Sequence, residues 1–349
     1  MWAADERTNR FPHRHDSLET LRILLRHTSP PPRVGSALLL LVILALQATV
    51  ATGCAHVPPS MPNASSLESW TTWREARDRS LRAPQSWLTL VGLHFLDDGA
   101  TTIGSDRSCG VQLPASAPAR LGTMHRTEGT VRFEPAGELL STAGTTAPSI
   151  TLDDKPLAAA ELRDDRDGTP SVIRTGSISI TLVHRNGTPA LRVRDDESPV
   201  RRTFDGIPSY PFAPQWVIAA RVERPTSPTM IPITNVTGFV EEQPLEAAIH
   251  AEIGGAPVRL LATAGSKPGS LFLVFADHTN RDGSYPGGRF LDVEPPDEQG
   301  RIVLDFNRAY NPACAFTAFA TCPTPPAANR LPVSVEAGER YPPRWRSAP

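Results

Sequence analysis

The sequence predicts a mainly β fold of two domains, with one short helix near the N-terminus of the first. The chain has 349 residues, which is enough for two ordinary domains. It contains 36 prolines and 24 glycines, and only 40% of its residues are hydrophobic. Between these turn-forming residues, Val, Ile, Thr and Phe recur in short bursts. This pattern is typical of β-strands joined by many turns.

Residues 1–54 have the features of a secretion signal with a lipobox. An apolar run from Val34 to Val50 follows a polar, arginine-bearing stretch, and it is too short for a firm transmembrane helix. The run ends at Ala51-Thr52-Gly53-Cys54, where Cys54 resembles the cysteine that receives lipid. We therefore expect export to the cell envelope and a lipid anchor at Cys54. A plain secreted protein and an accidental apolar segment are the alternatives.

A tether and a helix come next. Residues 55–64 are rich in Pro and Ser, as expected between an anchor and a folded body. Ser65 or Ser66 can cap a helix. The helix itself is predicted from the spacing of five residues, Leu67, Trp70, Trp73, Arg77 and Leu81.

The rest of the first domain, which spans 65–195, is predicted to be β-sheet. Strands are expected at 86–95, 101–104, 111–113, 130–133, 149–152, 178–184 and 190–193. Ile178, Ile180 and Leu182 alternate with other residues, so we expect these strands to have one wet face. Arg185-Asn186-Gly187 has the composition of a tight hairpin turn.

Gly99 to Pro114 resembles the opening of a forkhead-associated (FHA) domain, which implies a β-sandwich. In that family a phosphate-binding arginine follows the glycine, and a Ser-Arg-x-His element comes later. Here Ser105 follows Gly104, and Ala119-Arg120-Leu121-Gly122 stands at the later position. The resemblance therefore supports an FHA-like sandwich and argues against binding of a phosphothreonine peptide.

A charged, proline-rich connector at 196–214 separates this domain from a second β domain at 215–341. Strands of the second domain, a sheet or barrel, are expected at 216–222, 230–234, 247–253, 258–263, 271–275, 289–293 and 302–306. The segment after the last strand carries too many prolines for a regular helix or a central strand.

Polar residues gather in this second domain and carry a family resemblance. The motifs are Phe204-Asp205-Gly206, Tyr285, Gly288-Arg289-Phe290-Leu291, Asp305-Phe306-Asn307, Ala309-Tyr310-Asn311-Pro312, Cys314-Ala315-Phe316, Cys322-Pro323, Pro325-Pro326, Asn329-Arg330-Leu331 and Gly338-Glu339. Over residues 86–340 the chain resembles the domain of unknown function 1684 family. The resemblance implies no activity. It marks the motif positions Asp277, Tyr285, Arg289, Asp305, Asn307, Asn311 and Asn329.

Each of these residues has a ligand-binding and a structural interpretation. The Arg289 guanidinium can grip a carboxylate or phosphate with two hydrogen bonds, or it can pair with Asp277 or Asp305. The asparagines and Tyr285 can contact a ligand, although asparagines in proline-rich loops commonly hold turns. Asp277 or Asp305 would be the general base of an enzyme, or a simple capping carboxylate.

Cys314 and Cys322 form the disulfide candidate, because an oxidising compartment favours pairing of nearby cysteines. Two packed thiols, or a metal or redox pair, are the alternatives. Cys109 is expected to be a core residue.

Several functions are disfavoured by composition. The formal net charge is −2 with no basic run, so we expect no nucleic-acid partner. Standard catalytic, dinucleotide and metal motifs are absent, so no cofactor or metal is expected. The sequence thus favours an uncharacterised envelope lipoprotein that binds a small polar or anionic ligand in its C-terminal domain. A hydrolase-like enzyme using Asp277 or Asp305 with Arg289, and a structural adaptor, are the alternatives.

Overall fold

The computed structural model describes residues 66–137, 139 and 150–341. These residues lie in one compact unit. The predicted signal peptide with its lipobox, and the tether at 55–64, lie outside the described residues. Within the described ranges, no helix is both long and apolar enough to cross a membrane. The predicted domain bounds, including the connector at 196–214, stay predictions.

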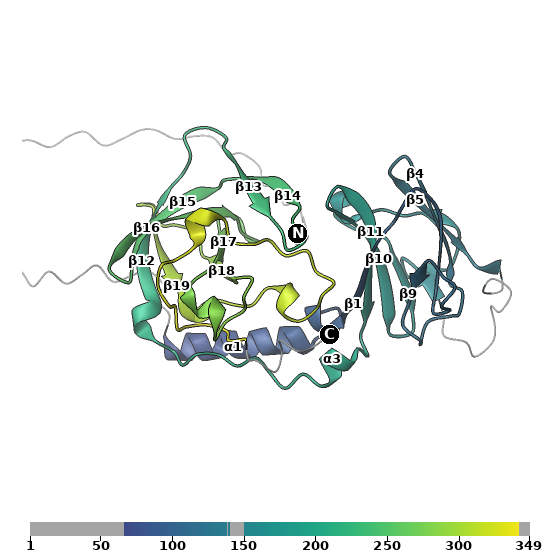
Figure 1. The fold of residues 1–349 in the computed structure, drawn as a ribbon, viewed down its shortest axis with the longest axis horizontal. Coiled ribbons are helices and arrows are strands. Elements are labelled where there is room, and N and C mark those ends of the chain that lie inside the picture. Colours follow the sequence, from purple (N-terminus) through teal and green to yellow (C-terminus); the bar gives the residue numbers. More distant parts are fainter. Residues whose placement is uncertain (1–65, 138, 140–149, 342–349) are drawn as a thin grey trace, which may run out of the picture. The chain divides into compact units, whose positions relative to one another are not determined.

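Helix α1, Leu67–Arg82, begins where the sequence placed a cap. Ser66 caps it with a reciprocal capping box to Ser69, which satisfies backbone N–H groups of the first turn. Trp70 is buried, and its Nε1 donates to the carbonyl of Asn307 at 2.8 Å. The helix therefore packs on the C-terminal half of the chain (Figure 1).

The N-terminal half is an FHA-like β-sandwich, as predicted. One sheet has the order β1-β11-β10-β9-β6-β7, and the other β3-β2-β4-β5-β8. Their bounds are β1 Leu90–Phe95, β2 Gly99–Gly104, β3 Val111–Gln112, β4 Gly122–Thr127, β5 Thr130–Pro135, β6 Ile150–Leu152, β7 Lys155–Pro156, β8 Ala160–Glu161, β9 Val172–Thr175, β10 Ile178–Arg185 and β11 Thr188–Asp195. Residues such as Phe133, Ile180 and Leu191 fill the core between the sheets.

Strand β4 is missing from the predicted strands. Only Gly122 and Met124 mark its core side, and the rest of the strand is polar. Gly122 is required there, because a Cβ atom would lie 2.4 Å from the carbonyl oxygen of Glu134 and 2.5 Å from the ring of Phe133. A glycine in place of an apolar residue hides the alternating pattern that identifies a strand.

The β10–β11 hairpin places polar and apolar residues on opposite faces of its sheet. Asn186 and Gly187 have φ values of 50° and 75°, as in a type I′ turn, which confirms the predicted hairpin. Leu191 and Val193 are buried in the sandwich core. Arg192 and Arg194 alternate with them and therefore lie on the outer face.

The C-terminal half is built on a six-stranded antiparallel sheet, with the order β18-β17-β16-β15-β12-β19, and a separate β13–β14 hairpin (Figure 1). The bounds are β12 Val217–Glu223, β13 Met230–Thr234, β14 Val240–Pro244, β15 Ala247–Ile253, β16 Ala256–Ala264, β17 Leu271–Phe275, β18 Arg289–Val293 and β19 Arg301–Asp305. After β19 the chain runs through short 3-10 turns and extended backbone to Tyr341, without a further strand or α-helix. This confirms the mainly β fold class.

A buried ion pair ties that final segment to the sheet. The Arg289 and Asp277 side chains are both 0% exposed, and Nη2 of Arg289 lies 2.7 Å from Oδ2 of Asp277. The same nitrogen donates to the carbonyl of Val335 at 2.9 Å, and Nη1 donates to that of Ala337. Oδ1 of Asp277 accepts the backbone N–H of Val335 at 3.1 Å. The pair thus connects the end of β17, the start of β18 and the segment at 335–337.

Removing the charge of Arg289 tests how much this connection stabilises the fold. We expect Arg289→Met to lower the free energy of unfolding by about 3–5 kcal/mol, because Asp277 would remain buried without its partner. The control is Lys267→Met at the exposed pair with Glu294, where the change should stay under about 1 kcal/mol. Urea titrations of both variants measure the difference. Equal, small changes in the two variants would contradict a structural role for the pair.

Candidate functional site

The three asparagines of the C-terminal motif are buried and hold backbone in place. Oδ1 of Asn329 accepts the N–H of Leu261 at 2.7 Å, and its Nδ2 donates to the carbonyls of Leu261 and Val274. Asn307 makes the same two-way contact with the backbone of Ala213, at 2.8 and 3.1 Å. These bonds join loops to strands β16 and β17 and to the chain before β12. The structural interpretation therefore fits both residues better than ligand contact.

Asn311 and Glu339 form a similar buried junction. The Asn311 N–H donates to Glu339 at 2.7 Å, and its Nδ2 donates to the carbonyl of Arg340 at 3.0 Å. Arg77 of α1 pairs with the same glutamate at 2.9 Å. Asn311 thus helps to seat the helix on the C-terminal half.

Arg289 is not placed as a ligand anchor, contrary to the expectation from the sequence. Its side chain is fully buried, and both terminal nitrogens already donate within the protein. Asp277, a candidate base, is enclosed with it and caps the 3-10 turn η4, His278–Arg281. Asp305, the other candidate, pairs with Arg308 at 3.2 Å and accepts from Asn307. The structure pairs Arg289 with Asp277 and leaves Asp305 with a different arginine.

Tyr285 and the two cysteines have surroundings that alter their acidity. Tyr285 packs edge-on against Tyr341, with 5.1 Å between the rings, and burial raises the pKa of its hydroxyl. Cys314 and Cys322 are free thiols, and each backbone N–H donates to the other sulfur, at 3.2 and 3.3 Å. The hydrogen bond from Cys322 lowers the pKa of Cys314, and donating it raises the pKa of Cys322. The sulfurs are adjacent, and the disulfide stays a prediction about the oxidised chain.

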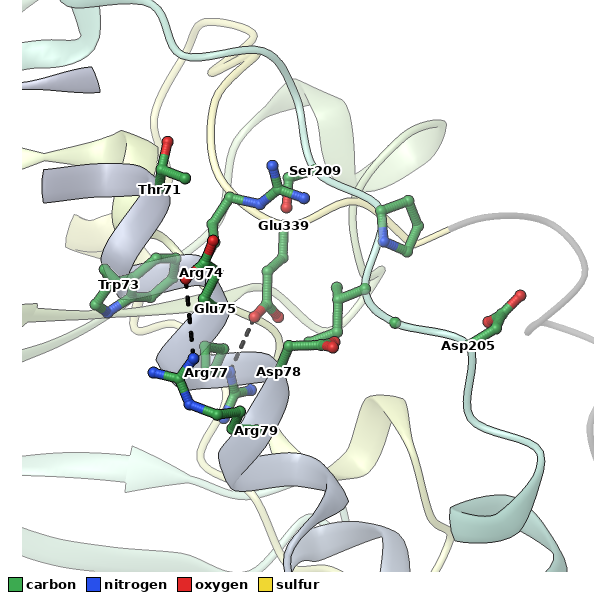
Figure 2. Close-up of a pocket in the computed structure, with 13 residues that line it drawn as sticks. Thr71, Trp73, Arg74, Glu75, Arg77, Asp78, Arg79, Asp205, Ser209 and Glu339 are labelled. Atoms are coloured by element: carbon green, nitrogen blue, oxygen red, sulfur yellow. Dashed lines mark hydrogen bonds and ion pairs between the residues drawn. The ribbon is translucent and has the colours of Figure 1, made fainter. Parts of the chain in front are cut away.

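One cavity, of about 680 Å³, lies between α1 and residues 205–209, with Glu339 among its lining residues (Figure 2). Several of its charged groups are paired. Arg77 pairs with Glu339, and Arg79 lies 3.8 Å from Glu75. Arg74 also lines the cavity and lies over the Trp70 ring at 4.8 Å, so it is the one arginine of this cavity without an ion pair among the described residues. Within the described residues, no cluster of three or more His, Cys, Asp or Glu is arranged to hold a metal.

A second cavity, of about 500 Å³, has a different character, and we name it the arginine cavity. Four arginines line it, Arg77, Arg185, Arg192 and Arg194, and no Asp or Glu is among its described lining residues. Arg192 and Arg194 come from β11, an interior strand of the sandwich. The facing wall comes from the C-terminal half, at Phe290, Ala313 and 319–322.

Arg192 and Arg194 have no hydrogen-bond or ion-pair partner among the described residues, and the Nε atoms of both are shielded from solvent. Arg185 differs, because it pairs with Asp165 at 2.6 Å. Burial lowers the pKa of Arg192 to about 10, with a further contribution from repulsion by Arg185 and Arg194. Burial also lowers the pKa of Arg194. Burial therefore disfavours both charges, and no described carboxylate is in direct contact with either guanidinium. From a greater distance, Asp165 favours the charge of Arg192 and Asp196 favours that of Arg194.

Sequence reasoning did not identify these two arginines. The available signal was the run Leu191-Arg192-Val193-Arg194, in which long cations alternate with core residues of a strand. Such a face normally lies in water. Here residues 319–322, more than 120 positions later in the chain, help to form the opposite wall.

Comparisons with known proteins place the C-terminal half in a family. Residues 202–340 match the family described as "Protein of unknown function (DUF1684)". An uncharacterised protein of Haloarcula marismortui, solved by NMR, is 31% identical, with a TM-score of 0.34. That match covers 40% of this chain and 78% of the archaeal one. Among curated proteins, none matches this chain significantly.

Two FHA-domain structures also match. The FhaA FHA domain, solved with the intracellular domain of Rv3910, is 17% identical over 29% of this chain and 97% of its own, with a TM-score of 0.19. A second, from a study of phosphothreonine-dependent FHA interactions, is 19% identical over 29% of this chain and 92% of its own, also with a TM-score of 0.19. By the family match, residues 202–340 of this chain belong to the DUF1684 family.

Proposed function

We propose that the protein binds a small anionic ligand in the arginine cavity. The observation that carries the proposal is the pair Arg192 and Arg194, whose guanidinium groups line the cavity without a partner among the described residues. Folded proteins normally pair a buried charge, because an uncompensated one is costly. An anion in the cavity would supply the missing partner.

The chemistry of the two side chains suits this role. A guanidinium presents several N–H donors in a planar fork, which matches the two oxygens of a carboxylate or phosphate. Arg192 and Arg194 lie two residues apart on one face of β11, so both guanidinium groups can donate hydrogen bonds to one anion. The ligand class is the one expected from the sequence, but the anchor is this pair and not Arg289.

The hydrolase alternative has one observation in its favour, because Asp305 lines another cavity, of about 530 Å³, together with Asp292, whose pKa is raised by burial. Asp277 is enclosed with Arg289, and Asp305 lies beside Arg308. Neither carboxylate lines the arginine cavity. We therefore propose binding and no reaction.

We also propose that this binding protein works in the cell envelope, attached to a membrane through a lipid on Cys54. The support is the apolar run Val34 to Val50, which ends in small residues before Gly53-Cys54. The proposal concerns residues outside the described ranges, and it is independent of the arginine cavity.

Arginine substitutions test the binding proposal. We expect the purified protein to bind inorganic phosphate or sulfate in a calorimeter at low salt. Arg192→Gln and Arg194→Gln should each weaken binding by roughly tenfold or more, since each removes charge-assisted hydrogen bonds. Arg174→Gln is the matched control, because Arg174 lies in the same sheet but is exposed. Unchanged affinity in the two cavity variants, or no binding of either anion by the wild type, would contradict the proposal.

The membrane proposal has its own test. In a bacterial host, Cys54→Ser should move the protein from the membrane pellet to the soluble envelope fraction, because serine cannot receive the thioether-linked lipid. Cys109→Ser is the control and should leave the protein in the pellet. If Cys54→Ser also stays in the pellet, attachment through Cys54 is excluded.

A further inference from the structure

The wall that faces the arginines is apolar, and this asymmetry narrows the ligand class. Resting on the proposed function above, we infer that the ligand is an amphiphilic anion, with an acidic head group on an alkyl or aryl body. The head would lie between Arg192 and Arg194, and the body would lie against Phe290, Ala313 and Phe319.

The two walls come from different parts of the chain and differ in chemistry. Arginines of β10 and β11 supply one side, whereas Phe290 of β18 and the segment 313–322 supply the other. Trp87 adds an aromatic surface, and its ring is held by Phe316 at 6.3 Å and by the Arg77 guanidinium at 4.7 Å. The apolar side is therefore a surface of aromatic and small apolar residues that an alkyl or aryl group could cover.

The size of the cavity points the same way. Small-molecule pockets measure roughly 300–1,000 Å³, and this one measures about 500 Å³. An inorganic ion on the two arginines would leave most of that volume, and the apolar wall, in contact with water. Phe319 is 38% exposed, which leaves apolar surface available to a ligand. Each methylene buried there would tighten binding by about fourfold.

A homologous series separates the head group from the body. We would titrate the purified protein with acetate, butyrate, hexanoate and octanoate at fixed ionic strength, with inorganic phosphate as the reference anion. The dissociation constant should fall by about fourfold for each methylene that enters the cavity, and level off when the cavity is full. 1-Octanol, which has the chain without the charge, should bind at least tenfold more weakly than octanoate.

Two variants assign the parts of the ligand to the two walls. In Phe319→Ala, the dissociation constant should fall less with each added methylene than in the wild type. The affinity for acetate and phosphate should be unchanged. Arg192→Gln should weaken the binding of every carboxylate in the series. The change in affinity for each added methylene should stay as in the wild type. Phe239→Ala is the matched control, because Phe239 is also 38% exposed but does not line the cavity.

The outcomes distinguish this inference from the proposed function. If octanoate binds no more tightly than acetate while phosphate binds, the anion site stands and the amphiphilic ligand is ruled out. If neither phosphate nor any carboxylate binds, both proposals fail. If octanol equals octanoate, the cavity is an apolar site and the head-group assignment is wrong.

Discussion

A buried positive charge needs a partner, and Asp277 is the partner of Arg289 in the interior of the C-terminal half. One guanidinium bonds to the end of β17 through Asp277 and to the final segment through the carbonyls of Val335 and Ala337. Up to Tyr341, the segment after β19 has only short 3-10 turns and no strand or α-helix, so side chains help to fix its path. Asn307 and Asn329 do the same elsewhere, each by donating to and accepting from backbone.

The rule that a buried charge is paired also identifies what is unusual in the arginine cavity. The terminal nitrogens of the fully enclosed Arg289 donate to Asp277 and to backbone carbonyls. The side chains of Arg192 and Arg194 are largely enclosed and make no hydrogen bond or ion pair with the residues that the structure describes. Their lowered pKa values reflect that difference, since burial and neighbouring arginines both disfavour the charged form. Sites that bind ligands commonly keep such unfavourable charge, which the ligand then relieves. The structural arginine, Arg289, thus has its carboxylate partner within the protein, whereas the proposed binding arginines, Arg192 and Arg194, have none among the described residues.

Local signals predicted local structure well. Ser66 predicted the start of the helix, and Asn186-Gly187 predicted the turn of the β10–β11 hairpin. Both predictions were possible because capping and turn geometry depend on a few adjacent residues. The C-terminal motif was recognised, but its role was not, since a dense set of polar residues looks alike in a binding site and in a buried scaffold. The alternation of Arg192 and Arg194 with core residues is visible in the sequence, but their enclosure is not, because only the folded chain brings 319–322 opposite β11.

The most direct test of this account is the free energy of unfolding of the Arg192→Gln/Arg194→Gln double variant, measured by urea titration without and with phosphate. The pKa of Arg192 is lower in the folded state than in the unfolded chain, so at neutral pH its charge opposes folding. Without phosphate, the double variant should therefore be more stable than the wild type, by on the order of 1 kcal/mol. Added phosphate should stabilise the wild type alone. The account would be contradicted if the double variant had a lower free energy of unfolding than the wild type and phosphate did not stabilise the wild type. Those results would show that the two arginines stabilise the fold.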